Sequence, residues 1–151
     1  MSANGQIEIY LSFDGSCRDA LEFYKTLFNG EITYYQEWKD APESEGESMD
    51  DMPDIVPDEV MHASLKIGDT TVMASDNPYR STVFGDSVTL TWSHPDENEV
   101  RRVWEAFVGA GATVHMGLEA TFFASLFGSL TDHFGISWQI MHWSEAGENA
   151  G

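Results

Sequence analysis

The segment Ile7–Gly30, with the sequence IEIYLSFDGSCRDALEFYKTLFNG, decides the fold of this chain. Apolar and polar residues alternate from Ile7 to Phe13, which predicts a half-buried β-strand. A turn at Asp14–Ser16 follows, and its Asp and Ser side chains are suited to accept hydrogen bonds from the first backbone N–H groups of a helix. The segment therefore predicts a strand that passes through a tight turn into a helix.

The expected helix is amphipathic and ends at Asn29–Gly30, residues that are typical of a left-handed helix cap. Its apolar residues recur at the spacing of one helical face: Cys17, Ala20, Leu21, Tyr24, Leu27 and Phe28. We expect Cys17, the only cysteine of the chain, to be a small buried hydrophobe on that face. A strand and helix of this kind need further strands to complete a sheet.

The rest of the chain supplies those strands and repeats the pattern. Strand-like segments follow at Glu31–Trp38, Val60–Ile67, Thr70–Ser75 and Ser87–Trp92, with a hairpin turn at Gly68–Asp69 and a long acidic loop at Lys39–Asp58. A second amphipathic helix is expected after Pro95–Asp96, and further strands at Thr113–Met116, Thr121–Phe127, Ser129–Thr131 and Ile136–Trp143. This order predicts an α+β protein built from tandem βαβββ modules, at about 6–80 and 85–143 of a single domain 1–151.

Charge is the compositional outlier, with 26 acidic and 7 basic residues and a formal net charge of −19. Such a surface argues against nucleic acid and anionic membranes as partners, because both require clustered Lys and Arg. Adaptation to concentrated salt and attraction of a cationic ligand both explain the acidity. No apolar run is long enough to span a bilayer, and the N-terminus has no signal-peptide pattern. We therefore expect a cytoplasmic protein.

Three segments together carry a resemblance to a known family: Tyr10–Glu31, Val60–Asp76 and Leu118–Ile140. They resemble the PhnB-like branch of the glyoxalase/bleomycin-resistance/dioxygenase (vicinal oxygen chelate) superfamily. The resemblance implies two βαβββ modules that form one curved, half-open mixed sheet around a cavity, and a homodimer. The branch usually has Trp and Gly at the positions of Phe123 and Ala124, so that turn is altered here. Some members of the branch carry the name demethylubiquinone methyltransferase, but no strand is followed by a glycine-rich nucleotide-binding turn.

The resemblance also implies candidate metal ligands, because enzymes of the superfamily hold one divalent metal with four side chains from four strands. Those positions fall on Glu8, His62, Ser87 and Gln139. The metal implied is Zn, Ni, Mn or Fe, and it would be held weakly, since Ser87 is a poor ligand for these metals. Glu8 could also act as a catalytic proton acceptor. Alternation places all four residues on the more polar face of their expected strands. The alternative is a degraded site whose polar groups hydrogen-bond to one another or to water.

Five further residues are candidates for the lining of the cavity: Tyr10, Ser64, Thr89, Phe122 and Phe123. Aromatic rings in an acidic cavity would suit a flat or cationic small molecule. The remaining histidines, His94, His115, His133 and His142, are expected to be structural. Three functions remain open: small-molecule binding without catalysis, a metal-dependent lyase, isomerase or dioxygenase that uses Glu8, His62 and Gln139, and a drug-sequestering protein of the bleomycin-resistance type.

Overall fold

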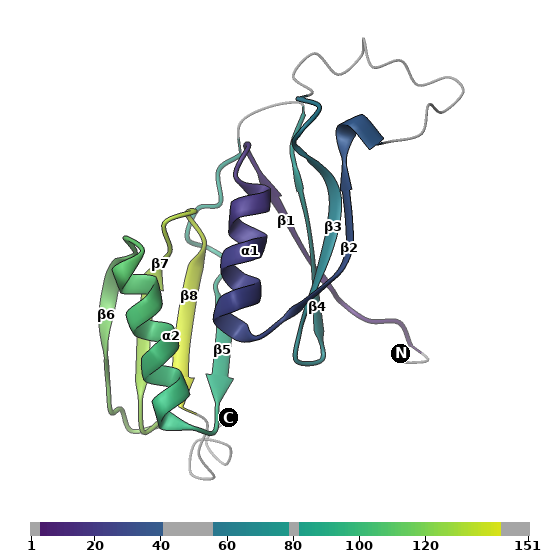
Figure 1. The fold of residues 1–151 in the computed structure, drawn as a ribbon. Coiled ribbons are helices and arrows are strands. Elements are labelled where there is room, and N and C mark those ends of the chain that lie inside the picture. The colour runs from purple at the N-terminus through teal and green to yellow at the C-terminus, as the bar shows by residue number, and fades with distance from the viewer. Residues whose placement is uncertain (1–3, 41–55, 79–81, 143–151) are drawn as a thin grey trace. The chain divides into compact units, whose positions relative to one another are not determined.

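The computed structural model describes residues 4–40, 56–78 and 82–142 (Figure 1). The chain divides into two compact units, Met1–Thr82 and Val83–Gly151. Each unit is a four-stranded mixed sheet with one long helix, which confirms the α+β class and the tandem βαβββ modules. That the two units share one domain and one curved sheet around a cavity remains a prediction.

The first unit contains β1 (Ile9–Phe13), α1 (Cys17–Phe28), β2 (Glu31–Glu37), a short 3₁₀ helix η1 (Trp38–Asp40), β3 (Val60–Ile67) and β4 (Thr70–Asp76). Its strand order is β1-β4-β3-β2; β1 and β4 run parallel, and the other neighbours run antiparallel. The helix α1 lies against β2, β3 and β4 and covers one face of this sheet (Figure 1).

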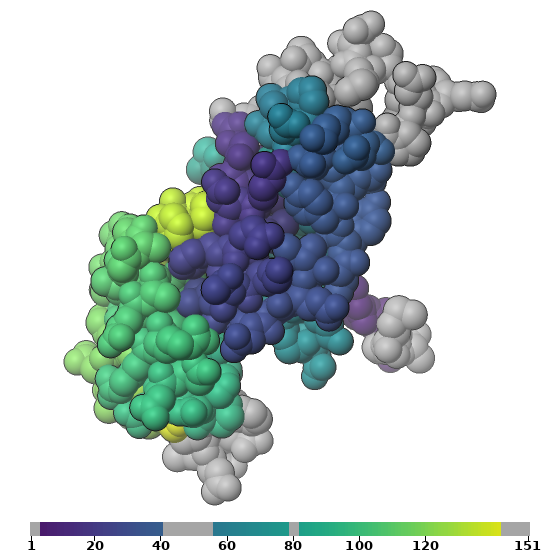
Figure 2. All heavy atoms as spheres, viewed as in Figure 1, coloured from purple at the N-terminus to yellow at the C-terminus, as the bar shows by residue number. Residues whose placement is uncertain are grey.

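The second unit contains β5 (Leu90–His94), α2 (Glu97–Gly109), β6 (Thr113–Glu119), β7 (Phe127–Thr131) and β8 (Ser137–His142). Its strand order is β5-β8-β7-β6, with β5 and β8 parallel. This is the topology of the first unit repeated strand for strand. The helix α2 contacts β5, β6 and β8, and in the space-filling view its green side chains cover much of the yellow β8 (Figure 2). The internal duplication predicted from the order of elements is therefore confirmed.

Both cores lie between a sheet and its own helix. The predicted apolar face of α1 is buried in full, together with the inward residues Ala63, Leu65, Val72 and Ala74 of the sheet. In the second unit Val100, Val103 and Phe107 of α2 are buried, and the ring of Phe107 lies 5.5 Å from that of Trp138 on β8. One face of each sheet is thus closed by a helix, which leaves the opposite face for other contacts.

The prediction for the segment around α1 is accurate for the helix and its Asn29 cap, and wrong on the N-terminal side of the helix. The helix spans Cys17–Phe28, and Asn29 adopts a left-handed φ of 55° as its cap. The first strand starts at Ile9, two residues later than predicted, because its pairing with β4 begins with the pair Ile9 and Val72. Ile7 is fully exposed. The side chain of Ser16 makes no cap hydrogen bond.

Two later strands also differ from the prediction. β5 begins at Leu90 rather than Ser87. In the parallel register that pairs Leu90 with Trp138, Ser87 and Val88 would lie opposite Gly135 and Ile136, which precede β8. The expected strand Thr121–Phe127 is a loop that joins β7 only at its last residue. Within that loop Thr121 and Ala124 close a turn, in which the backbone N–H of Thr121 donates to the Ala124 carbonyl.

Most of the predicted acidic loop falls on residues 41–55, which lie outside the described residues. Of the helices that the structure describes, neither α1 nor α2 has the length and apolar character needed to cross a membrane.

Candidate ligand-binding face

The face of the first sheet that is turned away from α1 carries a row of aromatic and small polar side chains. Register pairs Tyr10 with Met73, Met73 with Ser64, and Ser64 with Tyr34, so one row crosses β1, β4, β3 and β2. A second row pairs Ser12 with Ser75 and His62 with Gln36. We call this surface, defined by Tyr10, Tyr34, His62, Ser64 and Ser75, the aromatic face.

His62 is the centre of the aromatic face. Its ring centroid lies 5.7 Å from that of Tyr10, with an angle of 28° between the two planes, and 5.6 Å from that of Tyr34. Tyr10 and Tyr34 are 49% and 48% exposed. Three rings from three strands thus form a continuous surface that is open to solvent.

Hydrogen bonds hold the two tyrosines of the aromatic face in place. The Tyr10 hydroxyl donates to Ser75 Oγ at 2.9 Å, and it lies 3.4 Å from Nδ1 of His62. The Tyr34 hydroxyl donates to Gln36 Oε1 at 2.6 Å. Because the phenol oxygens are already anchored, the ring faces are positioned before any ligand arrives, which lowers the entropy cost of binding.

A β-bulge puts Tyr34 on this face. Ile32 pairs with the buried Leu65, but Tyr34 pairs with Ser64, so Thr33 is an extra residue in β2. Without the extra residue, Ile32 and Tyr34 would lie on the same face, because side chains of a strand alternate. Tyr34 and Gln36 were missed as site residues in the sequence, since alternation alone does not reveal a bulge. Ser75 of β4 was missed as well, although alternation with the buried Ala74 could have placed it on this face.

The structure places the predicted residues of the first unit in different settings. Tyr10, His62 and Ser64 share the aromatic face. Glu8 lies outside β1, is exposed, and its carboxylate accepts a hydrogen bond from the side chain of Gln6. Within this unit, His62 lies beside the rings of Tyr10 and Tyr34 and opposite Gln36 of β2.

The predicted residues of the second unit are more dispersed. Gln139 lies on β8, where its Oε1 accepts a hydrogen bond from the Thr91 hydroxyl at 3.1 Å. Thr91, rather than Ser87 or Thr89, is the residue of β5 beside Gln139, since both predicted residues precede the strand and are exposed. Phe122 is fully exposed, and Phe123 is half-buried.

Among the described residues, neither unit by itself gathers the set of His, Cys, Asp or Glu ligands that a metal centre needs. In the described part of the chain, no three or more His, Cys, Asp or Glu side chains gather in a way that could hold a metal ion. Glu8 and His62 belong to the first unit, and Ser87 and Gln139 to the second. Three ligands at least are needed for the sites that these metals occupy in enzymes. The shared four-residue site remains a prediction.

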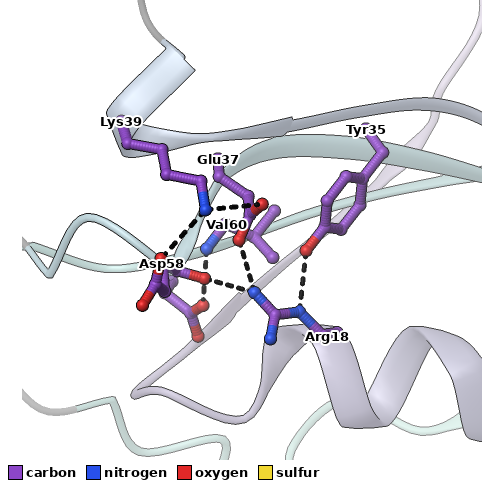
Figure 3. Close-up of polar contacts among 7 residues, drawn as sticks. Arg18, Tyr35, Glu37, Lys39, Asp58 and Val60 are labelled. Atoms are coloured by element: carbon purple, nitrogen blue, oxygen red, sulfur yellow. Dashed lines mark hydrogen bonds and ion pairs between the residues drawn. The ribbon is translucent and has the colours of Figure 1, made fainter.

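A separate polar cluster lies on the helix side of the first sheet (Figure 3). Arg18 of α1 donates to the Tyr35 hydroxyl at 2.9 Å and to the Glu37 carboxylate, and also to the Asp58 carbonyl. Lys39 lies 3.1 Å from the Asp58 carboxylate, and this hydrogen bond raises the pKa of Lys39. The cluster ties α1 to β2 and to the residues that precede β3.

Comparison with known proteins identifies the family. A family model described as 3-demethylubiquinone-9 3-methyltransferase matches residues 5–141. The chain belongs to this family. Protein YjdN of Escherichia coli K12 is 31% identical over 134 residues, which are 87% of this chain and 90% of that protein. The PhnB-like membership predicted from the sequence is therefore confirmed.

Solved structures agree with that assignment. Protein PA1353 of Pseudomonas aeruginosa is 31% identical, with a TM-score of 0.76 over 91% of this chain and 97% of that chain. A PhnB protein of Bacillus cereus gives a TM-score of 0.73 at 23% identity, over 92% and 100% of the two chains. A glyoxylase/bleomycin resistance protein/dioxygenase domain of Frankia sp. EAN1pec gives 0.64 at 11% identity, over 95% and 100%. The last two show a shared fold, the vicinal oxygen chelate fold.

The altered turn of this PhnB-like chain is packed by phenylalanines. The ring of Phe123 contacts Phe122 and Phe127 edge-on, at centroid distances of 5.1 and 5.0 Å. Ala124 is buried beside them. Edge-to-face contacts of this kind stabilise aromatic pairs beyond the area that they bury.

Proposed function

We propose that this PhnB-like protein binds a small molecule with a flat aromatic or cationic group on its aromatic face. The observation that carries this proposal is the contact of His62 with the half-exposed rings of Tyr10 and Tyr34. Exposed aromatic rings are unusual on a surface without a partner, and their faces attract flat rings and cations.

The charge of the protein favours a cation over an anion. The net charge of −19 attracts positively charged ligands at long range and repels carboxylates and phosphates. At short range, the electron-rich tyrosine faces contribute about 0.5–2 kcal/mol for a cation stacked on them. The neighbouring Ser64 and Ser75 hydroxyls would orient the polar edge of such a ligand.

Three probes of matched size test the proposal by isothermal titration calorimetry: N-methylquinolinium, quinoline and naphthalene-2-sulfonate. We expect the affinities to fall in that order, and Tyr34→Ala to weaken N-methylquinolinium binding by about 2- to 30-fold, the range that cation–π energies of about 0.5–2 kcal/mol give. Tyr35→Ala is the matched control, because Tyr35 is the next residue of β2, is also exposed, and lies on the opposite face. Equal loss in both variants, or no binding of any probe below millimolar concentration, would contradict the proposal.

The other predicted functions stay as alternatives. A metal-dependent lyase, isomerase or dioxygenase is supported by the open position of His62, and it requires Glu8 and Gln139 to join it. A drug-sequestering protein is supported by the same three rings, and differs in binding its ligand with high affinity and without turnover. For each of these functions, we propose that the protein forms a homodimer and is located in the cytoplasm.

A further inference from the structure

A serine and a histidine of the second unit form a hydrogen-bonded pair that the proposed function does not use. Ser125 Oγ is hydrogen-bonded to Nδ1 of His142, and Nε2 of the same ring lies 2.8 Å from the carbonyl oxygen of Pro95. Ser125 is exposed and His142 is half-buried. The three groups come from the loop before β7, the end of β8 and the turn before α2.

The Pro95 carbonyl determines which ring nitrogen of His142 carries the proton. A carbonyl oxygen only accepts hydrogen bonds, so Nε2 must be protonated and must donate. In a neutral imidazole Nδ1 then carries a lone pair, and the Ser125 hydroxyl donates to it. This is the arrangement of a nucleophile, a base and a group that orients the base.

We propose that Ser125 and His142 are a nucleophile–base pair that transfers acyl groups from carboxylic esters to water. Ser125 Oγ forms a bond to the ester carbonyl carbon while its proton passes to Nδ1 of His142. The carbon–oxygen bond of the ester then breaks, and the alcohol leaves with that proton. Water, deprotonated by the same nitrogen, attacks the acyl-serine; the acid leaves and Ser125 recovers its proton. The Pro95 carbonyl stabilises the transient imidazolium through Nε2.

The surroundings of Ser125 indicate the class of ester. Phe123 and Phe127 lie two residues before and two residues after it, and with the fully exposed Phe122 they form a contiguous series of rings. An aryl or other apolar acyl group would pack on these rings, whereas a charged one would not. The expected substrates are therefore esters of apolar acids.

The same unit contains a matched control. Nε2 of His115 is hydrogen-bonded to the Thr131 hydroxyl at 2.8 Å. Among the described residues, no group orients the other nitrogen of His115 as Pro95 orients that of His142. If any exposed histidine–hydroxyl pair were reactive, both pairs would behave alike.

A fluorophosphonate probe tests the proposal on the whole chain. Labelling forms a bond between Ser125 Oγ and phosphorus, breaks the phosphorus–fluorine bond and releases fluoride. We expect one label on Ser125 by mass spectrometry, none in Ser125→Ala, at least about 100-fold slower labelling in His142→Gln, and an unchanged rate in His115→Gln. A burst of p-nitrophenol from p-nitrophenyl benzoate should show the same dependence on the variants.

A cysteine in place of the serine separates a lost base from a damaged fold. We expect Ser125→Cys to react with iodoacetamide about 10-fold or more faster than Ser125→Cys combined with His142→Gln, because the imidazole promotes the thiolate. Labelling of wild type no faster than of Ser125→Ala, or equal alkylation of the two cysteine variants, would overturn the proposal.

Discussion

The carboxylate of Asp76, the last residue of β4, accepts a hydrogen bond at 3.1 Å from the backbone N–H of Cys17, 59 residues earlier. The same carboxylate accepts from the backbone N–H of Gly15 at 2.8 Å and of Val60 at 2.9 Å. Asp76 is fully buried. It therefore caps α1 in place of Asp14 or Ser16, and joins the start of the helix to the start of β3.

Asp76→Asn should be strongly destabilising. The substitution removes the charge and turns one acceptor into an N–H₂ group that faces backbone donors, so at least one buried N–H loses its partner. We expect the free energy of unfolding to fall by about 2–4 kcal/mol, as for buried hydrogen bonds to charged groups. Urea denaturation measures this free energy of unfolding. The control is Asp69→Asn in the exposed β3–β4 turn, which should change the free energy of unfolding by less than about 0.5 kcal/mol. Equal values for the two variants would contradict this role.

Cys17 should make the protein less stable at alkaline pH. Burial, with a smaller contribution from the charge of Asp76, raises the pKa of the Cys17 thiol well above its ordinary value of 9.0. Above that pH the unfolded thiol ionises while the folded one stays protonated, so the unfolded state binds fewer protons and stability falls as pH rises.

The measurement compares wild type with Cys17→Ala in urea at pH 8 and pH 10. Between pH 8 and pH 10, the free energy of unfolding of the wild type should fall by about 1.4 kcal/mol more than that of the variant, which has no thiol to ionise. The comparison cancels the titration of Lys and Tyr residues common to both proteins. An identical loss in both would show that the thiol ionises as readily in the folded state as in the unfolded one.

Gly128→Ala should disrupt the second unit. A Cβ at Gly128 on β7 would lie 2.6 Å from the Trp104 ring of α2 and 3.1 Å from the Met116 carbonyl oxygen, so the indole would have to move. We expect the free energy of unfolding to fall by about 1–3 kcal/mol, the usual cost of overpacking. Gly117→Ala on β6 is the control, because nothing lies within 4 Å of its Cβ position. Thermal unfolding of both variants checks the expectation, which fails if Gly128→Ala is as stable as Gly117→Ala.

Removal of metal should leave ligand binding unchanged. The two tyrosine hydroxyls of the aromatic face already have hydrogen-bond partners, Ser75 for Tyr10 and Gln36 for Tyr34, so no metal is needed to hold the rings. Binding of N-methylquinolinium should be the same before and after treatment with EDTA. Near-stoichiometric metal in the purified protein, together with a metal-dependent rise in Tm that His62→Ala abolishes, would instead favour the metal-dependent enzyme.

Local patterns predicted much of this fold. The bounds of α1 follow from its apolar spacing and the Asn29 cap, and β3 follows from its alternation, because helix and strand periods depend on neighbouring residues alone. The predicted strand at Thr121–Phe127 was wrong, because local β propensity does not show whether a neighbouring strand is present. The residues there have no strand to pair with until Phe127.

The candidate site was predicted only in part. Tyr10, His62 and Ser64 share the aromatic face as alternation suggested. Tyr34 was missed because the bulge at Thr33 depends on how β2 pairs with β3.

The sequence by itself determined the two helices, the repeated order of elements and the family, because these depend on spacing along the chain. Only the tertiary structure decided that Asp76 caps a helix 59 residues away and that Ser125 meets His142. Such contacts depend on strand register and on the direction of a side chain after folding, where a shift of one residue moves a side chain to the opposite face. No pattern of neighbouring residues encodes them.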